Sequence, residues 1–101
     1  MGATEFSIEV CADRPAEAFR TAQIIARYEH GHAGYTGTIA EKDKFRMINL
    51  PLSFTEMCPY SFADECMLDD SHFCQDKWGP AACIQTNANP NVYLFFGFAP
   101  S

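Results

Sequence analysis

The densest group of side chains that could do chemistry lies in one glycine-rich segment, residues 30–42, with the sequence HGHAGYTGTIAEK. Its glycines, Gly31, Gly34 and Gly37, recur every third residue and let the backbone bring amide hydrogens close to a ligand. The histidines, hydroxyls and lysine between them add many hydrogen-bond donors and acceptors. Such a segment could hold a phosphate or another anion, with a histidine as acid or base.

The same glycines also have an explanation without a ligand. Phosphate-binding loops usually lie between a strand and the N-terminus of the next helix, whereas this segment follows an expected helix and leads into an expected strand. Its glycine spacing fits neither a P-loop nor a dinucleotide-binding motif. A helix C-cap followed by a tight connection is the simpler interpretation.

A second segment, DKWGPA at residues 76–81, is the other candidate for part of a binding site. Trp78 could stack on a planar ligand, although a lone tryptophan is more often a core residue. The candidate ligand-binding residues are His30, His32, Gly34, Tyr35, Thr36, Gly37, Thr38, Lys42 and Trp78. We expect a functional site if both segments line one pocket, because independent turns rarely do so.

Five cysteines and three histidines offer further combinations, and none has CxxC or HxxxH spacing. His30 with His32, or His72 with Cys74 and another cysteine, are weak candidates for zinc. A thiol beside a histidine is an equally weak candidate for nucleophilic catalysis. We therefore assign no catalytic residue, no metal and no cofactor, and we expect most thiols to be free, as in a reducing compartment.

Composition limits the classes of function. A chain of 101 residues with 48% hydrophobic residues can form one domain, residues 1–101, around one core. The net charge of −6 disfavours binding to nucleic acid, which requires lysines and arginines. No apolar run is long enough to span a membrane and no signal peptide is recognisable, so we expect a cytoplasmic protein.

The positions of the candidate residues depend on the elements around them. Residues 4–12 alternate between apolar and polar side chains, which predicts a strand, and Phe19, Ala22 and Ile25 lie on one side of a predicted helix. Residues 92–98 are almost continuously apolar, as in a strand that is central or covered on both faces. The predicted elements are a strand at 4–12, a helix at 14–30 ending at Gly31, strands at 35–40 and 45–50 ending at Pro51, and strands at 81–86 and 92–98.

Residues 53–77 interrupt this pattern as an insert, in which Ser61 and either Asp70 or Ser71 could cap short helical turns. The order is β-α-β-β-(insert)-β-β. It predicts an α+β fold in which one main helix packs on an antiparallel sheet of about four or five strands.

The segments GHAGYTGTIAEK (31–42) and DKWGPA (76–81) together resemble small uncharacterised proteins of bacteriophages and mobile elements. The cysteine-containing stretch between them has no counterpart in this resemblance. The resemblance implies a phage or mobile-element origin, and hence a location in the host cytoplasm. It implies no activity and no catalytic residues.

Three functions follow as hypotheses. The first is a non-enzymatic binding protein, such as a phage factor that inhibits a host defence protein with its acidic face, or a protein that sequesters a small anionic ligand. The second is a small enzyme acting on a nucleotide or another phosphorylated ligand, held by the hydroxyls of the glycine-rich segment and Lys42. The third is an assembly protein that forms a homo-oligomer through its last strand.

Overall fold

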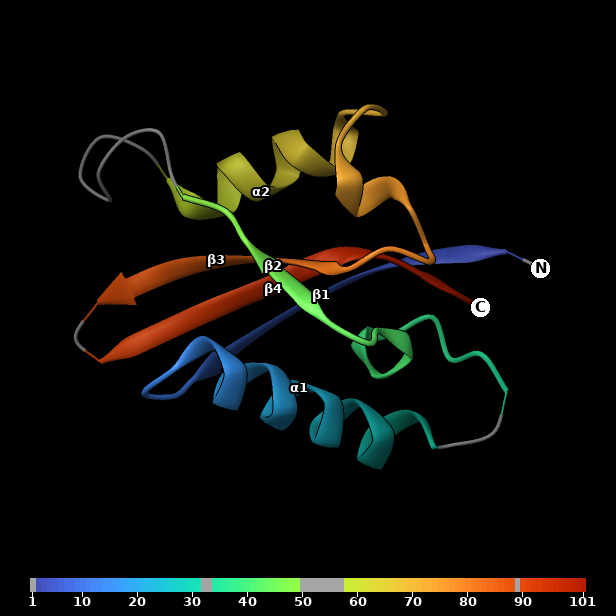
Figure 1. The fold of residues 1–101 in the computed structure, drawn as a ribbon, viewed down its shortest axis with the longest axis horizontal. Coiled ribbons are helices and arrows are strands. Elements are labelled where there is room, and N and C mark those ends of the chain that lie inside the picture. Colours follow the sequence, from blue (N-terminus) through green and yellow to red (C-terminus); the bar gives the residue numbers. More distant parts are fainter. Residues whose placement is uncertain (1, 32–33, 50–57, 89) are drawn as a thin grey trace.

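The computed structural model describes residues 2–31, 34–49, 58–88 and 90–101 (Figure 1). The α+β class that the sequence predicts is confirmed, with four strands and two α-helices in these ranges. Neither described helix is long and apolar enough to cross a membrane. In chain order the elements are β1 (Ala3–Cys11), α1 (Pro15–His30), the 3-10 turn η1 (Ile39–Glu41), β2 (Phe45–Met47), α2 (Pro59–Leu68), the 3-10 turn η2 (Phe73–Gln75), β3 (Ala81–Ala88) and β4 (Asn91–Pro100).

The last strand, β4, lies inside the sheet, whose order is β1-β4-β3-β2. It pairs antiparallel with β1 on one side, from Ala3 opposite Pro100 to Cys11 opposite Val92, and antiparallel with β3 on the other. The short strand β2 pairs with β3 in parallel. The sheet is therefore mixed, and the prediction of a purely antiparallel sheet is wrong at this edge.

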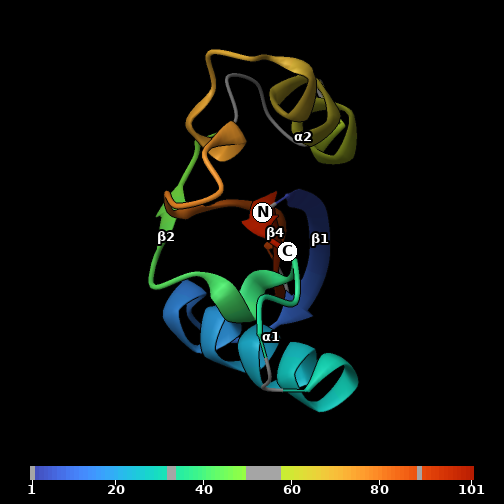
Figure 2. The same ribbon diagram turned by 90° about the vertical axis from the view of Figure 1, so that its right-hand side faces the viewer.

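The two helices cover opposite faces of the sheet, as Figure 2 shows when the strands are viewed nearly end-on. Phe95 of β4 is fully buried on the α1 side, where its ring lies 5.7 Å from that of Phe19. Phe96 points to the opposite face, into a cluster that includes Ala63 and Cys66 of α2. The apolar run of β4 is thus explained by burial on both faces, as predicted.

The first strand and helix form where local sequence favours them. In β1, Phe6 and Val10 are buried while Glu5, Ser7 and Glu9 on the other face are exposed. Helix α1 begins with Pro15, which needs no amide partner in the first turn. It ends at Gly31, whose φ of 81° favours glycine and whose N–H donates to the Arg27 carbonyl at 2.8 Å.

The predicted hairpin of strands 35–40 and 45–50 is not formed. Residues 35–38 belong to no strand, and Ile39 starts η1, where it is buried in the cluster beneath α1. Gln23 of α1 donates from Nε2 to the carbonyls of Ile39 at 3.3 Å and Lys42 at 2.5 Å. Contacts with the helix therefore override the β propensity of this segment. Pro51, the predicted end of the second strand, lies outside the described residues.

The predicted insert supplies the second helical layer. Helix α2 begins at Pro59 after Cys58, rather than at Ser61, and η2 follows His72 rather than Asp70 or Ser71. The second apolar face of β4 requires a cover, so this region is part of the main fold. Residues 53–57 of the predicted insert lie outside the described ranges.

Gly37 packs tightly against the ends of β1 and β4. Its N–H donates to the Pro100 carbonyl at 2.9 Å, and its φ is +70°. A Cβ at this position would lie 2.8 Å from Thr4 Cβ and 3.1 Å from Ser101 Cβ. Gly34 has a similar φ of +68° but has nothing within 4 Å of such a Cβ.

These two glycines separate backbone strain from packing. Gly34→Ala should lower the free energy of unfolding by about 1 kcal/mol because of its positive φ alone. Gly37→Ala should lower it by about 3 kcal/mol, because the new methyl group also overlaps Thr4. Urea unfolding of both variants measures the difference. Equal losses would show that Gly37 does not pack against the sheet as described.

Candidate functional site

The hydroxyls of the glycine-rich segment bond to one another and to a carboxylate of the same segment. Thr36 Oγ1 lies 2.8 Å from Thr38 Oγ1 and donates to Glu41 Oε2 at 2.8 Å, and the Thr36 N–H donates to the same oxygen at 3.2 Å. Thr38 Oγ1 also accepts from the Ala40 N–H at 3.3 Å and so caps η1. This network fixes the shape of the turn and places a carboxylate beside both hydroxyls.

Lys42 joins this segment to the second candidate segment. Its ammonium donates to the carbonyls of Asp76, Lys77 and Gly79 at 3.2, 3.1 and 2.9 Å. The side chain is only 3% exposed, and burial lowers the pKa of Lys42, an effect opposed by the nearby charge of Asp76. An ammonium group has three donors, and all three are used here, so Lys42 acts as a structural connection.

Tyr35 and Trp78 make a second contact between the two segments. Their ring centroids lie 5.7 Å apart in an edge-to-face arrangement, and both residues remain exposed, Tyr35 by 49% and Trp78 by 61%. The segments that the sequence paired as candidates are therefore neighbours in space. They meet through a buried ammonium group and an aromatic contact.

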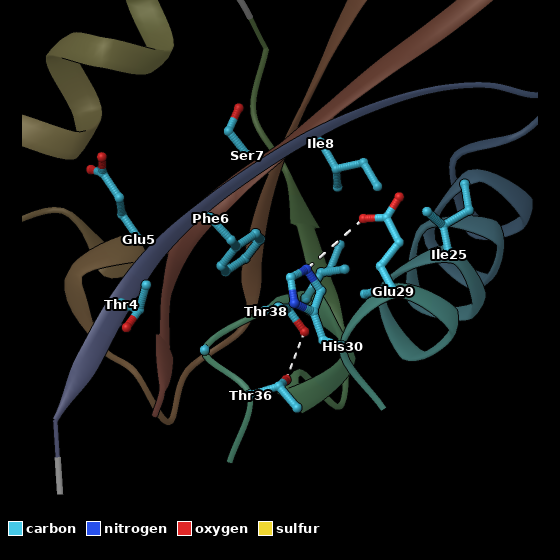
Figure 3. Close-up of a pocket in the computed structure, with 13 residues that line it drawn as sticks. Thr4, Glu5, Phe6, Ser7, Ile8, Ile25, Glu29, His30, Thr36 and Thr38 are labelled. Atoms are coloured by element: carbon cyan, nitrogen blue, oxygen red, sulfur yellow. Dashed lines mark hydrogen bonds and ion pairs between the residues drawn. The ribbon is translucent and has the colours of Figure 1, made fainter. Parts of the chain in front are cut away.

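A groove runs between β1, the C-terminal part of α1 and residues 36–39, and we call it the β1 groove (Figure 3). Its volume is about 490 Å³. Phe6 and Ile8 of β1 and Ile25 of α1 supply apolar surface, while Glu29 and His30 stand at the helix end. The full lining is Thr4, Glu5, Phe6, Ser7, Ile8, Ile25, Ala26, Glu29, His30, Thr36, Gly37, Thr38 and Ile39.

The structure places seven of the nine predicted ligand-binding residues in two groups. Four of them line the β1 groove: His30, Thr36, Gly37 and Thr38. Tyr35, Lys42 and Trp78 form the connection described above, and Gly34 lies outside the lining of the groove. His32 lies outside the described residues. Trp78 and the glycine-rich segment thus touch each other, but Trp78 does not line the β1 groove.

A second, smaller groove of about 250 Å³ lies on the other face of β1, beneath α2. Glu5 and Ser7 of β1 and Asp64 of α2 supply polar groups to it, and we call it the acidic groove after its two carboxylates. The rest of its lining is apolar or aromatic: Phe6, Tyr60, Ala63, Met67, Leu94 and Phe96. Glu9 lies on the same face, where its Oε2 accepts from Tyr60 at 2.5 Å and Thr86 at 2.8 Å. Carboxylates therefore follow this face of β1, and neither groove is lined by a described lysine or arginine.

The sequence does not predict that β1 and Ile25 line a groove. Alternation in β1 indicates only a strand, and the spacing of Ile25 predicts only a place on the buried face of the helix. Ile25 is in fact 37% exposed, and its neighbour Ile24 is 58% exposed. Two adjacent isoleucines on an amphipathic helix were an available signal, because both cannot point to the core.

The cysteines are all free thiols, as the sequence predicts for most of them. Burial raises the pKa of Cys83 to about 12 and that of Cys74 to about 11. The candidate zinc pair has a local role, since His72 Nδ1 accepts from the Cys74 N–H at 3.1 Å. Among the described residues, no group of three or more histidine, cysteine or acidic side chains could hold a metal ion.

Comparison of the chain with protein-family models, with curated proteins and with solved structures finds no match.

Lys42 can be tested by removing its charge. Lys42→Met should lower the free energy of unfolding by about 3 kcal/mol, because three carbonyls lose a buried cationic donor. Lys44→Met, at an exposed position, is the matched control and should change it by less than about 0.5 kcal/mol. Chemical unfolding of both variants measures the two changes in the free energy of unfolding. Similar values for the two lysines would contradict the structural role of Lys42.

Thiol reactivity tests the placement of the cysteines. Hydrogen bonds from the Ser61 amide and hydroxyl and from the Tyr60 amide lower the pKa of exposed Cys58. Thiolate is the reactive form of a thiol. In folded protein at neutral pH, Cys58 should therefore react with a disulfide reagent at a higher rate than the thiol of free glutathione does. Buried Cys83 should react only after unfolding. Mass spectrometry after timed labelling identifies each site, and early labelling of Cys83 would refute its burial.

Proposed function

We propose that this protein is a non-enzymatic binding protein that holds a partner protein in the β1 groove. The observation that carries the proposal is the groove itself, which combines an apolar floor with the border of an exposed strand. Apolar grooves with a few polar groups at the rim are the usual form of a binding site. Ile25, partly exposed at the edge of this groove, offers apolar surface for a partner.

The chemistry of the lining favours binding over catalysis. Thr36 and Thr38 are hydrogen-bonded to each other, and Thr36 also bonds to Glu41. No cysteine lines the groove, and Lys42, the candidate phosphate-binding cation of the glycine-rich segment, donates to three carbonyls instead. A nucleotide enzyme and a protein that sequesters a small anion are both disfavoured, because Glu29 lines this groove and no described lysine or arginine does.

A host protein is the partner we propose. The resemblance to bacteriophage and mobile-element proteins supports a target in the host. A small phage protein of this kind could act as an inhibitor of a host defence protein. The net charge of −6 supports a partner with a basic surface, because opposite charges speed association and orient the complex. An oligomer built on the last strand is disfavoured because β4 is already paired on both sides.

Two neighbouring isoleucines provide the test. Ile25→Lys places a charge in the β1 groove, whereas Ile24→Lys makes the same change on the same helix outside the lining. Immobilised wild-type protein should retain a bacterial protein. The Ile24→Lys variant should retain the same protein equally well, whereas the Ile25→Lys variant should retain about tenfold less of it. Quantitative mass spectrometry of the bound fractions measures this.

Circular dichroism first establishes that both variants are folded. Equal retention by the two variants would exclude the β1 groove as the binding surface. Absence of any protein that is retained by wild type and Ile24→Lys would contradict the proposed function itself.

A further inference from the structure

One side of β1 carries a row of backbone groups that no other described element uses. Gly2 and Ser101 exchange both N–H···O bonds, at 3.3 and 3.1 Å, and the Ala12 N–H donates to the Asn91 carbonyl. In an antiparallel ladder such bonded pairs alternate, so even-numbered residues of β1 bond to β4. Odd-numbered residues, from Ala3 to Cys11, direct their N–H and C=O groups away from β4.

This free edge lies at the border of the sheet. β1 is the first strand in the order β1-β4-β3-β2, and within the described ranges no backbone hydrogen bond reaches its outer side. In Figure 2 β1 occupies one side of the molecule, with α1 and α2 on the two faces beside it. An exposed edge of nine residues is long for a strand and is able to pair with another chain.

The two faces beside the edge differ in character. On the α1 face, Ile8 and Ile25 give the β1 groove its apolar surface. On the α2 face, Glu5 lines the acidic groove with Asp64, and the Glu9 carboxylate accepts hydrogen bonds from Tyr60 and Thr86. A strand added to this edge would place alternate side chains on these two faces. Its residues on one face would meet apolar surface, and those on the other would meet carboxylates.

We propose that the edge of β1 binds an extended segment of the partner protein as an additional strand, and that this segment alternates basic with apolar residues. Main-chain hydrogen bonds to odd-numbered residues of β1 supply affinity, as in other cases of strand addition. Basic side chains opposite Glu5 and Glu9 set specificity, while apolar side chains enter the β1 groove beside Ile8. This inference rests on the proposed function and specifies the mode of binding.

A second copy of this chain is a poorer occupant of the same edge. Antiparallel pairing of two β1 strands about Ser7 would set Glu5 of each copy opposite Glu9 of the other. Like charges directly opposite destabilise a sheet, and each copy carries a net charge of −6. The free edge is therefore matched to a cationic strand and protected against self-association by its own carboxylates.

Hydrogen exchange with a defined peptide tests this proposal. The probe is a synthetic peptide of alternating lysine and valine, added to isotopically labelled protein and followed by NMR. Strand addition should slow exchange of the Glu5, Ser7 and Glu9 amides by about tenfold, because they gain hydrogen bonds. The amides of Phe6 and Ile8, already bonded to β4, should keep their exchange rates. A peptide of alternating glutamate and valine should not bind.

A substitution and a modified probe provide independent controls. Ser7→Pro removes one outward-facing donor without removing a bond to β4, since proline is tolerated on the free side of an edge strand. It should weaken peptide binding about tenfold, while Ser7→Ala should not. If Ser7→Pro does not fold, N-methylation of every second residue of the peptide replaces it. Methylation of the residues whose N–H groups face β1 should abolish binding, and methylation of the other residues should not.

The outcomes separate the two proposals. Protection confined to odd-numbered amides supports strand addition. Peptide binding with unchanged exchange at these amides overturns strand addition but leaves the groove as a binding surface. If the lysine–valine peptide does not bind, a cationic strand is not the occupant of this edge. The same conclusion follows if the odd-numbered amides become protected when the protein self-associates, as measured by light scattering. The Ile25→Lys experiment remains independent of each result.

Discussion

The structure depends on the burial of β4. Seven of its ten residues are buried, from Tyr93 to Gly97 and again at Ala99 and Pro100. A strand with apolar side chains on both faces must be covered on both faces, and its backbone must be paired on both sides. The placement of α1 and α2 on opposite faces and of β1 and β3 on either side follows from this requirement. β1, the strand with glutamates, is at the same time an edge of the sheet.

The elements that sequence reasoning predicted well are those determined by local signals. Each of these signals lies within a few consecutive residues. They are the alternation of β1, the start of α1 at Pro15 and its end at Gly31, and the apolar run of β4. The mispredicted elements depend on distant contacts. Ile39 has the residue type of a strand but is buried beneath α1, and Phe45 pairs in parallel with Ala81, a partner that no local pattern indicates.

The candidate site was predicted in part for the same reason. The two segments singled out by composition do meet, through Lys42 and the contact of Tyr35 with Trp78. Their meeting is structural, because the lysine is buried and all its donors bond to carbonyls. The β1 groove shares His30 and residues 36–38 with the prediction but takes its apolar surface from Phe6, Ile8 and Ile25. The alternation of side chains shows that β1 has two different faces. The same alternation occurs in edge strands and in central strands, so it does not show that β1 lies at the edge of the sheet.

The pairing of β1 with β4 also affects how the chain reaches its fold. Ala3 pairs with Pro100, so the longest ladder of the sheet joins strands that are far apart in sequence. Contacts of such high sequence separation slow folding, because a long loop must close before they form. During synthesis β1 and α1 emerge from the ribosome early, whereas β4 emerges late. Until then β1 has two unpaired sides, and its glutamates protect the nascent chain from pairing with its neighbours.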